Sequence, residues 1–321
     1  MSENTTPALR LENVSKSFGE FAAVSDLSLT VRRGRVYGLL GPNGAGKTTT
    51  IRMIVNIIAP DAGTIELFGR PMGVELMDRL GYLPEERGLY KKMRVGDQLR
   101  YFAQLKGMTA RAADAAADRW LARLNLSEWK AKKTDELSKG MQQKVQFVAT
   151  VMHDPDLLIL DEVFSGLDPV SREAMITVLE ELKSEGRTII FSTHQMEQAE
   201  RLCDDICLIN RSRKILEGSL REVKRGFGRR AVALRAEGAD GALDDPAIVA
   251  GVKRLGDHDE VLLGEGADAQ ELLRRLVARG ANVMRFEMIE PSLHDIFLQQ
   301  VGGDAAPAAG AGGASGAGGD G

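Results

Sequence analysis

The sequence predicts an α/β protein with a mostly parallel sheet, followed by a smaller α+β unit. Compact apolar strands alternate with helical patterns between about residues 35 and 225, and this alternation is typical of a helix-covered parallel sheet. A second group of strands and helices follows residue 226. The length of 321 residues also suits two units better than one.

Composition and charge narrow the class of protein. Hydrophobic residues make up 43% of the chain and charged residues 27%, so the chain can bury a core and fold unaided. The net charge of −4 gives no bulk attraction to nucleic acid, and no nucleic-acid partner is expected. Cys203 and Cys207, the two cysteines, fit buried thiols in a reducing compartment better than a disulfide scaffold.

No segment of the sequence is suited to crossing a membrane. The longest apolar stretches have five or six residues bounded by charge, whereas a membrane-spanning helix needs about 20. The first residues also lack a secretory pattern. Any role at a membrane therefore requires a second, membrane-spanning chain.

The first third of the chain predicts strands and then a strand, loop and helix. Residues 10–31 alternate apolar and polar side chains around a turn at Phe18–Glu20, which indicates antiparallel strands. An apolar strand at 35–40 leads into a glycine-rich segment and then a helix that Pro60 ends. From about residue 86 to 136 the sequence is Ala-rich and charged with helical spacing, which predicts a helical insertion.

The α/β pattern then resumes up to the second unit. The expected elements, in order, are a helix from Ser138, a strand at 157–161, a helix after Pro169, a strand at 188–193, a further helix, and strands at 206–210 and 214–218.

The second unit resembles a βαββαβ ferredoxin-like module. Its expected elements are a strand at 231–237, a short helix near 246–251, strands at 252–255 and 260–264, a helix at 268–280, a strand at 282–289 and a helix at 292–301. The predicted domains are therefore residues 8–225 and 226–301, and the Gly/Ala-rich segment 302–321 is expected to be a disordered tail.

A phosphate-binding loop is the most specific motif. The segment from Gly41 to Thr48 has the required pattern and lies between a predicted strand and a predicted helix. Its backbone N–H groups can converge on phosphates, Lys47 supplies positive charge, and the Thr48 hydroxyl can ligate Mg²⁺. The residues expected to hold ATP here are Gly41, Pro42, Asn43, Gly44, Ala45, Gly46, Lys47, Thr48 and Thr49.

Two acidic residues end the predicted strand at 157–161. Asp161 is suited to the coordination shell of Mg²⁺, and Glu162 is suited to act as general base toward a water that attacks the γ-phosphate, or at least to orient that water. The alternative is an acidic strand end that only caps a helix. The upstream phosphate-binding loop favours the catalytic interpretation.

Between these two motifs the chain resembles the ABC ATPase superfamily. The segment Leu137–Gln143 is a variant of that family's signature sequence. The resemblance implies an ABC-type nucleotide-binding fold in which Ser138 and Gly140 complete the ATP site of a second subunit. Ser138 is also a good helix N-cap, which is the local alternative.

Further family landmarks follow in order. Ser165–Asp168 lies just beyond the predicted catalytic Glu162, and Thr193–His194 follows the strand at 188–193. The resemblance implies that His194 contacts the γ-phosphate, whereas an isolated histidine after a strand is more often structural. It also implies that Phe18 stacks on adenine, and the alternative is a core phenylalanine at a hairpin turn.

Two positions depart from the usual family pattern. The signature carries Lys139 and Met141, and Glu85 stands where most relatives have Gln. A glutamate oxygen can still reach metal or water, so Glu85 is a candidate ligand for nucleotide and for Mg²⁺. Its charge can change how the nucleotide state is coupled to a partner.

Taken together, residues 8–301 resemble the ATP-binding subunits of bacterial sodium-efflux and multidrug exporters. This resemblance implies an ATPase that uses ATP and Mg²⁺, forms a head-to-tail ATP-bound dimer, and powers export of Na⁺ or drug-like substrates through a separate polytopic membrane permease. Such a subunit lies peripherally on the cytoplasmic face of the membrane. Residues 226–301 can regulate, stabilise the dimer or cover the core, and the sequence does not choose among these roles.

Two other functions fit the sequence less well. The first is a soluble ABC ATPase acting on ribosomes or DNA, which the single cassette and the lack of a basic patch disfavour. The second is a module that binds ATP without turnover. It is disfavoured because Lys47, Asp161, Glu162 and His194 are all present.

Overall fold

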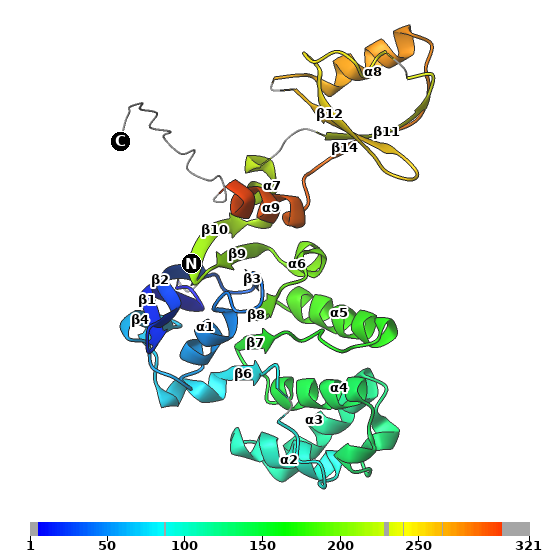
Figure 1. Ribbon diagram of the computed structural model, residues 1–321. Coiled ribbons are helices and arrows are strands. Elements are labelled where there is room, and N and C mark those ends of the chain that lie inside the picture. The colour runs from blue at the N-terminus through cyan, green and yellow to red at the C-terminus, as the bar shows by residue number, and fades with distance from the viewer. Residues whose placement is uncertain (1–5, 87, 228–230, 240, 265, 304–321) are drawn as a thin grey trace, which may run out of the picture.

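The computed structural model describes residues 6–86, 88–227, 231–239, 241–264 and 266–303, and Figure 1 shows their arrangement. The strands are β1 (Leu9–Phe18), β2 (Phe21–Val31), β3 (Val36–Leu40), β4 (Ala62–Leu67), β5 (Arg70–Pro71), β6 (Leu80–Leu83), β7 (Leu157–Asp161), β8 (Thr188–Thr193), β9 (Asp205–Asn210), β10 (Arg213–Ser219), β11 (Ala231–Glu237), β12 (Val249–Arg254), β13 (Asp259–Leu263) and β14 (Asn282–Ile289). The α-helices are α1 (Lys47–Ile54), α2 (Val95–Leu105), α3 (Ala110–Arg123), α4 (Lys139–Val151), α5 (Pro169–Ser184), α6 (Met196–Leu202), α7 (Leu220–Gly226), α8 (Ala269–Ala278) and α9 (Leu293–Gly303).

The central sheet has the strand order β10-β9-β3-β8-β7-β6. Strands β9, β3, β8, β7 and β6 are parallel, and β10 is an antiparallel edge. Because parallel strands end at the same edge of a sheet, the loops after β3, β7 and β8 lie close together. The phosphate-binding loop, the acidic pair Asp161–Glu162 and His194 are found at this edge.

Alternating side chains of the central strands pack in two separate apolar cores. In β3, Tyr37 and Leu39 pack with one apolar cluster, whereas Val36 and Leu40 pack with the other. The first cluster also contains α1 and the separate antiparallel sheet β2-β1-β4-β5, and the second contains α4, α5 and α6. A strand with both faces buried is continuously apolar, which is why the central strands are short runs of aliphatic residues.

The helical insertion is present as α2 and α3, which pack against each other and against α4. One strand was not predicted from the sequence: Leu80–Leu83 form strand β6, which pairs in parallel with β7. The strand was missed because Leu80–Leu83 is only four residues long and contains a glycine that fits beside Thr150.

The C-terminal unit has a sheet of order β12-β13-β11-β14 with all neighbours antiparallel, as in a ferredoxin-like module. Helix α8 lies over one face, burying Leu272 and Leu276. The predicted short helix near 246–251 was wrong. Only one turn closes on Asp245, and the β-branched Val249 then pairs with Leu263 as the first residue of β12.

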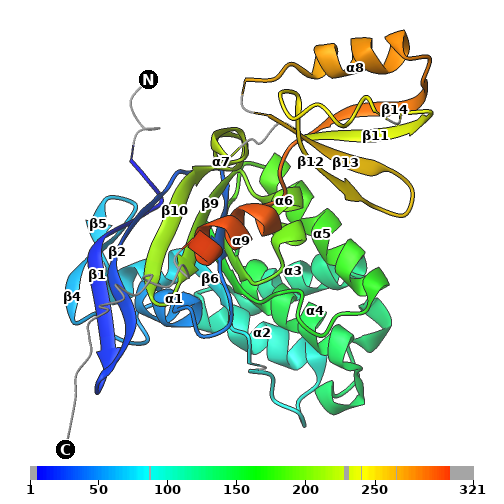
Figure 2. The same cartoon turned by 45° about the horizontal axis from the view of Figure 1, so that its top comes forward.

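Helix α9 leaves the C-terminal unit and packs beside α6 of the first unit (Figure 2). Its Leu293 and Ile296 are buried in the same apolar cluster as α4, α5 and α6. The helix extends to Gly303, so Gly302 and Gly303 belong to it rather than to the predicted tail. The rest of that tail, 304–321, lies outside the described residues. Within the described residues, no helix has the length and apolar character of a membrane span.

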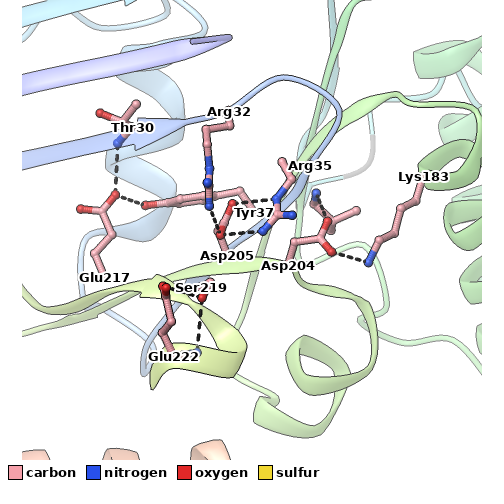
Figure 3. A network of polar contacts seen from close by, with 11 residues as sticks. Thr30, Arg32, Arg35, Tyr37, Lys183, Asp204, Asp205, Glu217, Ser219 and Glu222 are labelled. Carbon is pink, nitrogen blue, oxygen red and sulfur yellow. Dashed lines mark hydrogen bonds and ion pairs between the residues drawn. The ribbon is translucent and has the colours of Figure 1, made fainter. Parts of the chain in front are cut away.

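A polar network lies at the amino ends of the central strands (Figure 3). Arg32 and Arg35 both donate to the Asp205 carboxylate, at 2.8–3.1 Å. Burial raises the pKa of Asp205, but the hydrogen bonds from Arg35 and Arg32 outweigh burial and hold the pKa below its usual value. The ionised carboxylate therefore stabilises the fold.

We expect Asp205→Asn to lower the free energy of unfolding by about 1–2 kcal/mol, because it removes charge-assisted hydrogen bonds at a buried site. Since the folded pKa is lowered, this contribution is present above the unfolded pKa of about 3.9 and is lost as the pH falls through the folded value. Urea unfolding at pH 7 and at pH 3 measures both effects. Asp156→Asn is the control, because Asp156 pairs with Arg79 at an exposed site. Equal losses of unfolding free energy in Asp205→Asn and Asp156→Asn would contradict the stabilising role of the Asp205 carboxylate.

Candidate functional site

The phosphate-binding loop joins β3 to α1 and requires glycine at two positions. Gly46 caps α1 with a φ of 107°, and a Cβ there would lie 2.4 Å from the Ala23 carbonyl oxygen. At Gly41, with a φ of 151°, a Cβ would lie 2.1 Å from the Ile209 carbonyl oxygen. Both positions combine a left-handed backbone with close packing against a neighbouring strand, so only glycine fits.

Lys47 is the first residue of α1 and is buried beneath the loop. Its Nζ donates to the Gly41 carbonyl at 2.8 Å and to the Pro42 carbonyl at 3.1 Å, and lies 3.7 Å from Glu162 Oε1. Burial lowers the pKa of Lys47, and the charges of Glu162 and Asp161 partly offset this. The ammonium group is thus held at the loop, beside the acidic end of β7.

Asp161 is fully buried at the end of β7, and its Oδ1 accepts a hydrogen bond from Ser192 on β8. Its Oδ2 has no partner among the described residues. Burial raises the pKa of Asp161, and the hydrogen bond from Ser192 and the nearby Thr48 hydroxyl partly offset this rise. A buried carboxylate oxygen without a protein partner, beside the Thr48 hydroxyl, fits an oxygen ligand of Mg²⁺.

Glu162 follows Asp161 with a left-handed φ of 48°. Its backbone N–H donates to Ser192 Oγ at 3.1 Å, and its Oε1 lies 3.0 Å from His194 Nδ1. A non-glycine residue in this conformation costs roughly 1–3 kcal/mol, and such strain is concentrated at functional sites. The strained turn directs one carboxylate oxygen toward both Lys47 and His194.

A cavity of about 410 Å³ opens over these residues. It is lined by Phe21, Ala23, Asn43, Gly44, Gly46, Lys47, Thr48, Thr49, Glu85 and Glu162. A second cavity, also of about 410 Å³, has Thr48, Glu85 and Asp161 in its lining. The three residues predicted as metal ligands therefore share one cavity. In the described part of the chain no cluster of three His, Cys, Asp or Glu side chains could hold a metal ion.

Other predicted residues lie away from these cavities. Ser138 caps α4 through a hydrogen bond from Met141 N–H, as the local interpretation expected, and neither it nor Gly140 lines the cavity of Lys47. Phe18 is 53% exposed, which contradicts the alternative of a core side chain. It is also absent from the cavity lining, so its contact with adenine stays a prediction.

The sequence analysis missed two residues of the site. Phe21, which pairs with Phe18 across the hairpin, lines the cavity and offers an aromatic face there. Ser192 joins Asp161 to the backbone of Glu162. A serine directly after the apolar run Ile189–Phe191 of β8 was the available signal, because a buried hydroxyl needs a hydrogen-bond partner.

Two family models match separate parts of the chain. Residues 24–165 match the ABC transporter family, and residues 218–301 match the C-terminal domain of DrrA1-3-like ATP-binding proteins. The ABC transporter ATP-binding protein YhaQ of Bacillus subtilis (strain 168) is 43% identical over 294 residues, which are 92% of this chain and 98% of that protein. The Nod factor export ATP-binding protein I of Burkholderia lata is 38% identical over 296 residues, 90% of this chain and 95% of that protein.

Two solved structures are also similar to this chain in fold. A structure of an ATP-binding subunit of an ABC transporter matches with a TM-score of 0.64 at 32% identity, covering 69% of this chain and 93% of its own. The structure of cbiO1 from Clostridium perfringens, part of the transporter complex cbiONQ, matches with a TM-score of 0.60 at 26% identity, covering 69% and 94%. The predicted fold class is confirmed.

We expect Ser192→Ala to lower kcat for ATP about tenfold with little change in KM, because the hydroxyl positions the Asp161 carboxylate and the Glu162 backbone without being placed to touch the nucleotide. The acid limb of the pH profile of kcat should shift to higher pH. The hydroxyl lowers the pKa of Asp161, so removing it leaves the neutral form populated to a higher pH.

Steady-state phosphate release between pH 5 and 9 measures both effects. Ser184→Ala is the control, because Ser184 is exposed near the end of α5 and bonds only its own helix. An unchanged acid limb in Ser192→Ala would rule out the positioning role.

Proposed function

The chain belongs to the ATP-binding subunits of ABC transporters, and on this premise we propose that it powers export through a separate membrane-spanning permease. One observation carries the hydrolytic part of the proposal. Glu162 Oε1 lies 3.0 Å from His194 Nδ1 and 3.7 Å from Lys47 Nζ, beside a cavity lined by the phosphate-binding loop. A base, a cation and a phosphate-binding loop are thus assembled within one chain.

The proposed reaction is attack of water on the γ-phosphorus of ATP. Glu162 accepts a proton from the attacking water, the bond from the γ-phosphorus to the bridging oxygen breaks, and ADP and phosphate are released. Lys47 and the N–H groups of the loop neutralise charge that develops on the phosphate oxygens. Thr48, Asp161 and Glu85 would hold Mg²⁺, which when bound neutralises phosphate charge. His194 orients Glu162 and contacts the γ-phosphate.

A second copy of the chain would complete the site. Ser138 and Gly140 begin α4 and do not line the cavity that contains Lys47. The N-terminus of a helix attracts phosphate, so the α4 end of one copy suits the γ-phosphate bound by another. ATP would then stabilise a head-to-tail dimer, and hydrolysis would remove the charge that bridges the two copies.

A groove beside the helical insertion supports the proposed contact with a permease. A cavity of about 260 Å³ lies between β6, α2 and α4, with Leu89, Phe102 and Leu105 in its lining. It lies next to the second cavity of the site, since Tyr82, Pro84 and Gly88 line both. An apolar groove adjoining the loop of Glu85 suits a cytoplasmic segment of a permease, which would then respond to the state of the nucleotide.

The proposed direction of transport, export, is inferred from relatives of the chain. The relative from Burkholderia lata is named for Nod factor export. Na⁺ and drug-like compounds remain the proposed cargo classes from the resemblance of the motifs. The subunit lies on the cytoplasmic face of the membrane in this proposal, held there by its permease.

We expect Glu162→Gln to reduce phosphate release at least a hundredfold while ATP binding persists, because the amide keeps the shape of the side chain but cannot accept the proton. The variant should form a dimer in the presence of ATP and Mg²⁺, as measured by light scattering. Lys47→Ala is the contrasting variant and should weaken both binding and hydrolysis. Full phosphate release by Glu162→Gln would refute the assignment of the base.

Co-purification tests the role in transport. A tagged copy extracted from gently solubilised membranes should be recovered together with a polytopic membrane protein. Recovery with ribosomes or DNA from a soluble pool would instead support the rival function. A Leu105→Asp variant should lose the membrane partner while keeping its basal ATPase activity, because Leu105 is 63% exposed at the groove.

A further inference from the structure

Helix α6 connects the catalytic site with the C-terminal unit. It begins at Met196, two residues after His194, and has only seven residues. Gln198 within it accepts a hydrogen bond from Thr193, the residue before His194. A displacement of α6 would therefore displace the His194 side chain relative to Glu162.

The C-terminal end of α6 is fixed to the central sheet. Lys183 of α5 donates to the Leu202 carbonyl at 3.1 Å and lies 2.9 Å from Asp204 Oδ1. The other oxygen of Asp204 accepts from Val36 N–H at the start of β3. Figure 3 shows Lys183 and Asp204 next to the cluster of Arg32, Arg35 and Asp205. This end of α6 is thus held from two neighbouring elements.

The exposed side of α6 is held by α7 and α9, the helices that precede and follow the sheet of the C-terminal unit. Glu200 of α6 pairs with Lys224 of α7 at 3.1 Å and accepts a hydrogen bond from Leu293 N–H at the start of α9. The side chains of Glu200 and Lys224 are mostly buried, with exposed fractions of 25% and 16%, respectively. A carboxylate at a helix N-terminus is also favoured by the helix dipole, so Glu200 stabilises the start of α9.

Apolar contacts strengthen the same junction. Ile296 and Leu293 of α9 are buried in the cluster that contains Ala199 and Leu202 of α6. The sheet and helix of residues 231–289 are thereby inserted between α7 and α9, and both of these helices meet at α6. The C-terminal unit is not joined to the first unit by a single flexible linker.

We propose that Glu200 is a positioning residue for ATP hydrolysis, through which α7 and α9 fix helix α6 and with it His194. In this role the C-terminal unit controls the rate of turnover. Conversely, binding of the γ-phosphate at His194 alters the packing of α9. The inference rests on the proposed contact of His194 with the γ-phosphate, so the test includes His194 itself.

The kinetic test uses the full chain with two variants at the junction. Glu200→Gln keeps an acceptor for Leu293 N–H but loses the charge that pairs with Lys224, and Ile296→Ala weakens the apolar contact. Each should lower kcat about tenfold with KM for ATP within about twofold, because remote misplacement of a catalytic group affects the transition state most.

Matched controls separate positioning from a loss of stability. Glu180→Gln removes an ion pair with Arg201 on the side of α6 that faces α5, and Leu298→Ala changes a 53%-exposed side chain of α9. Both controls should keep the kcat of the unmodified chain. At 10 °C the fold of the junction variants is retained. If their kcat at 10 °C equals that of the unmodified chain at the same temperature, the junction is only structural and the proposal is overturned.

Hydrogen exchange tests the transmission of the signal directly. In the Glu162→Gln background, ATP with Mg²⁺ should slow exchange in residues 195–202 and also in residues 293–300, and the added Glu200→Gln change should abolish the second effect. Protection of α6 without any response in α9 would overturn the proposal.

The His194 variant distinguishes a failure of the proposed γ-phosphate contact from a failure of the junction's role. If His194→Ala leaves kcat unchanged, the proposed contact of His194 is wrong and the inference falls with it. If His194→Ala removes turnover while Glu200→Gln and Ile296→Ala do not alter it, only the inference is overturned.

Discussion

The register of the three parallel strands β3, β8 and β7 is the constraint on which the site depends. Leu40 pairs with Thr193, and Ser192 pairs with Asp161, so all three strands end at one level of the sheet. The phosphate-binding loop, the acidic pair and His194 are the residues that directly follow these ends. A shift of one residue in this pairing would turn Asp161 and Ser192 away from each other.

The site also concentrates groups that are costly to bury. Lys47, Asp161 and Glu162 are all less than a tenth exposed, and burial raises the pKa of Asp161 while lowering that of Lys47. Their mutual attraction offsets part of this cost, and the hydroxyl of Ser192 offsets another part. The remaining cost favours binding of a ligand that brings negative phosphates to Lys47 and a cation to Asp161, because both reduce the unfavourable burial of charge.

The C-terminal unit is also joined to the first unit by buried contacts. Two cores on opposite faces of the central sheet hold the edge that carries the candidate site, and α9 adds its side chains to one of them. The ferredoxin-like sheet has its own core, built on β11, β13 and α8. Two cooperative units are thus joined by buried contacts at α6, which is the arrangement needed for one unit to influence the chemistry of the other.

The sequence by itself determined the class of fold, the phosphate-binding loop, the acidic pair and the family, because these are encoded in local periodicity and in residues that are neighbours along the chain. It did not identify strand β6 or exclude a helix near 246–251, since a short segment takes its conformation from the partner with which it pairs. It also missed Phe21 and Ser192, which enter the site only through strand pairing. Only the tertiary structure placed Ser138 and Gly140 away from the cavity of Lys47 and brought α9 against α6. Contacts between residues nearly one hundred positions apart, such as Glu200 and Leu293, follow from how the elements pack and have no local signature.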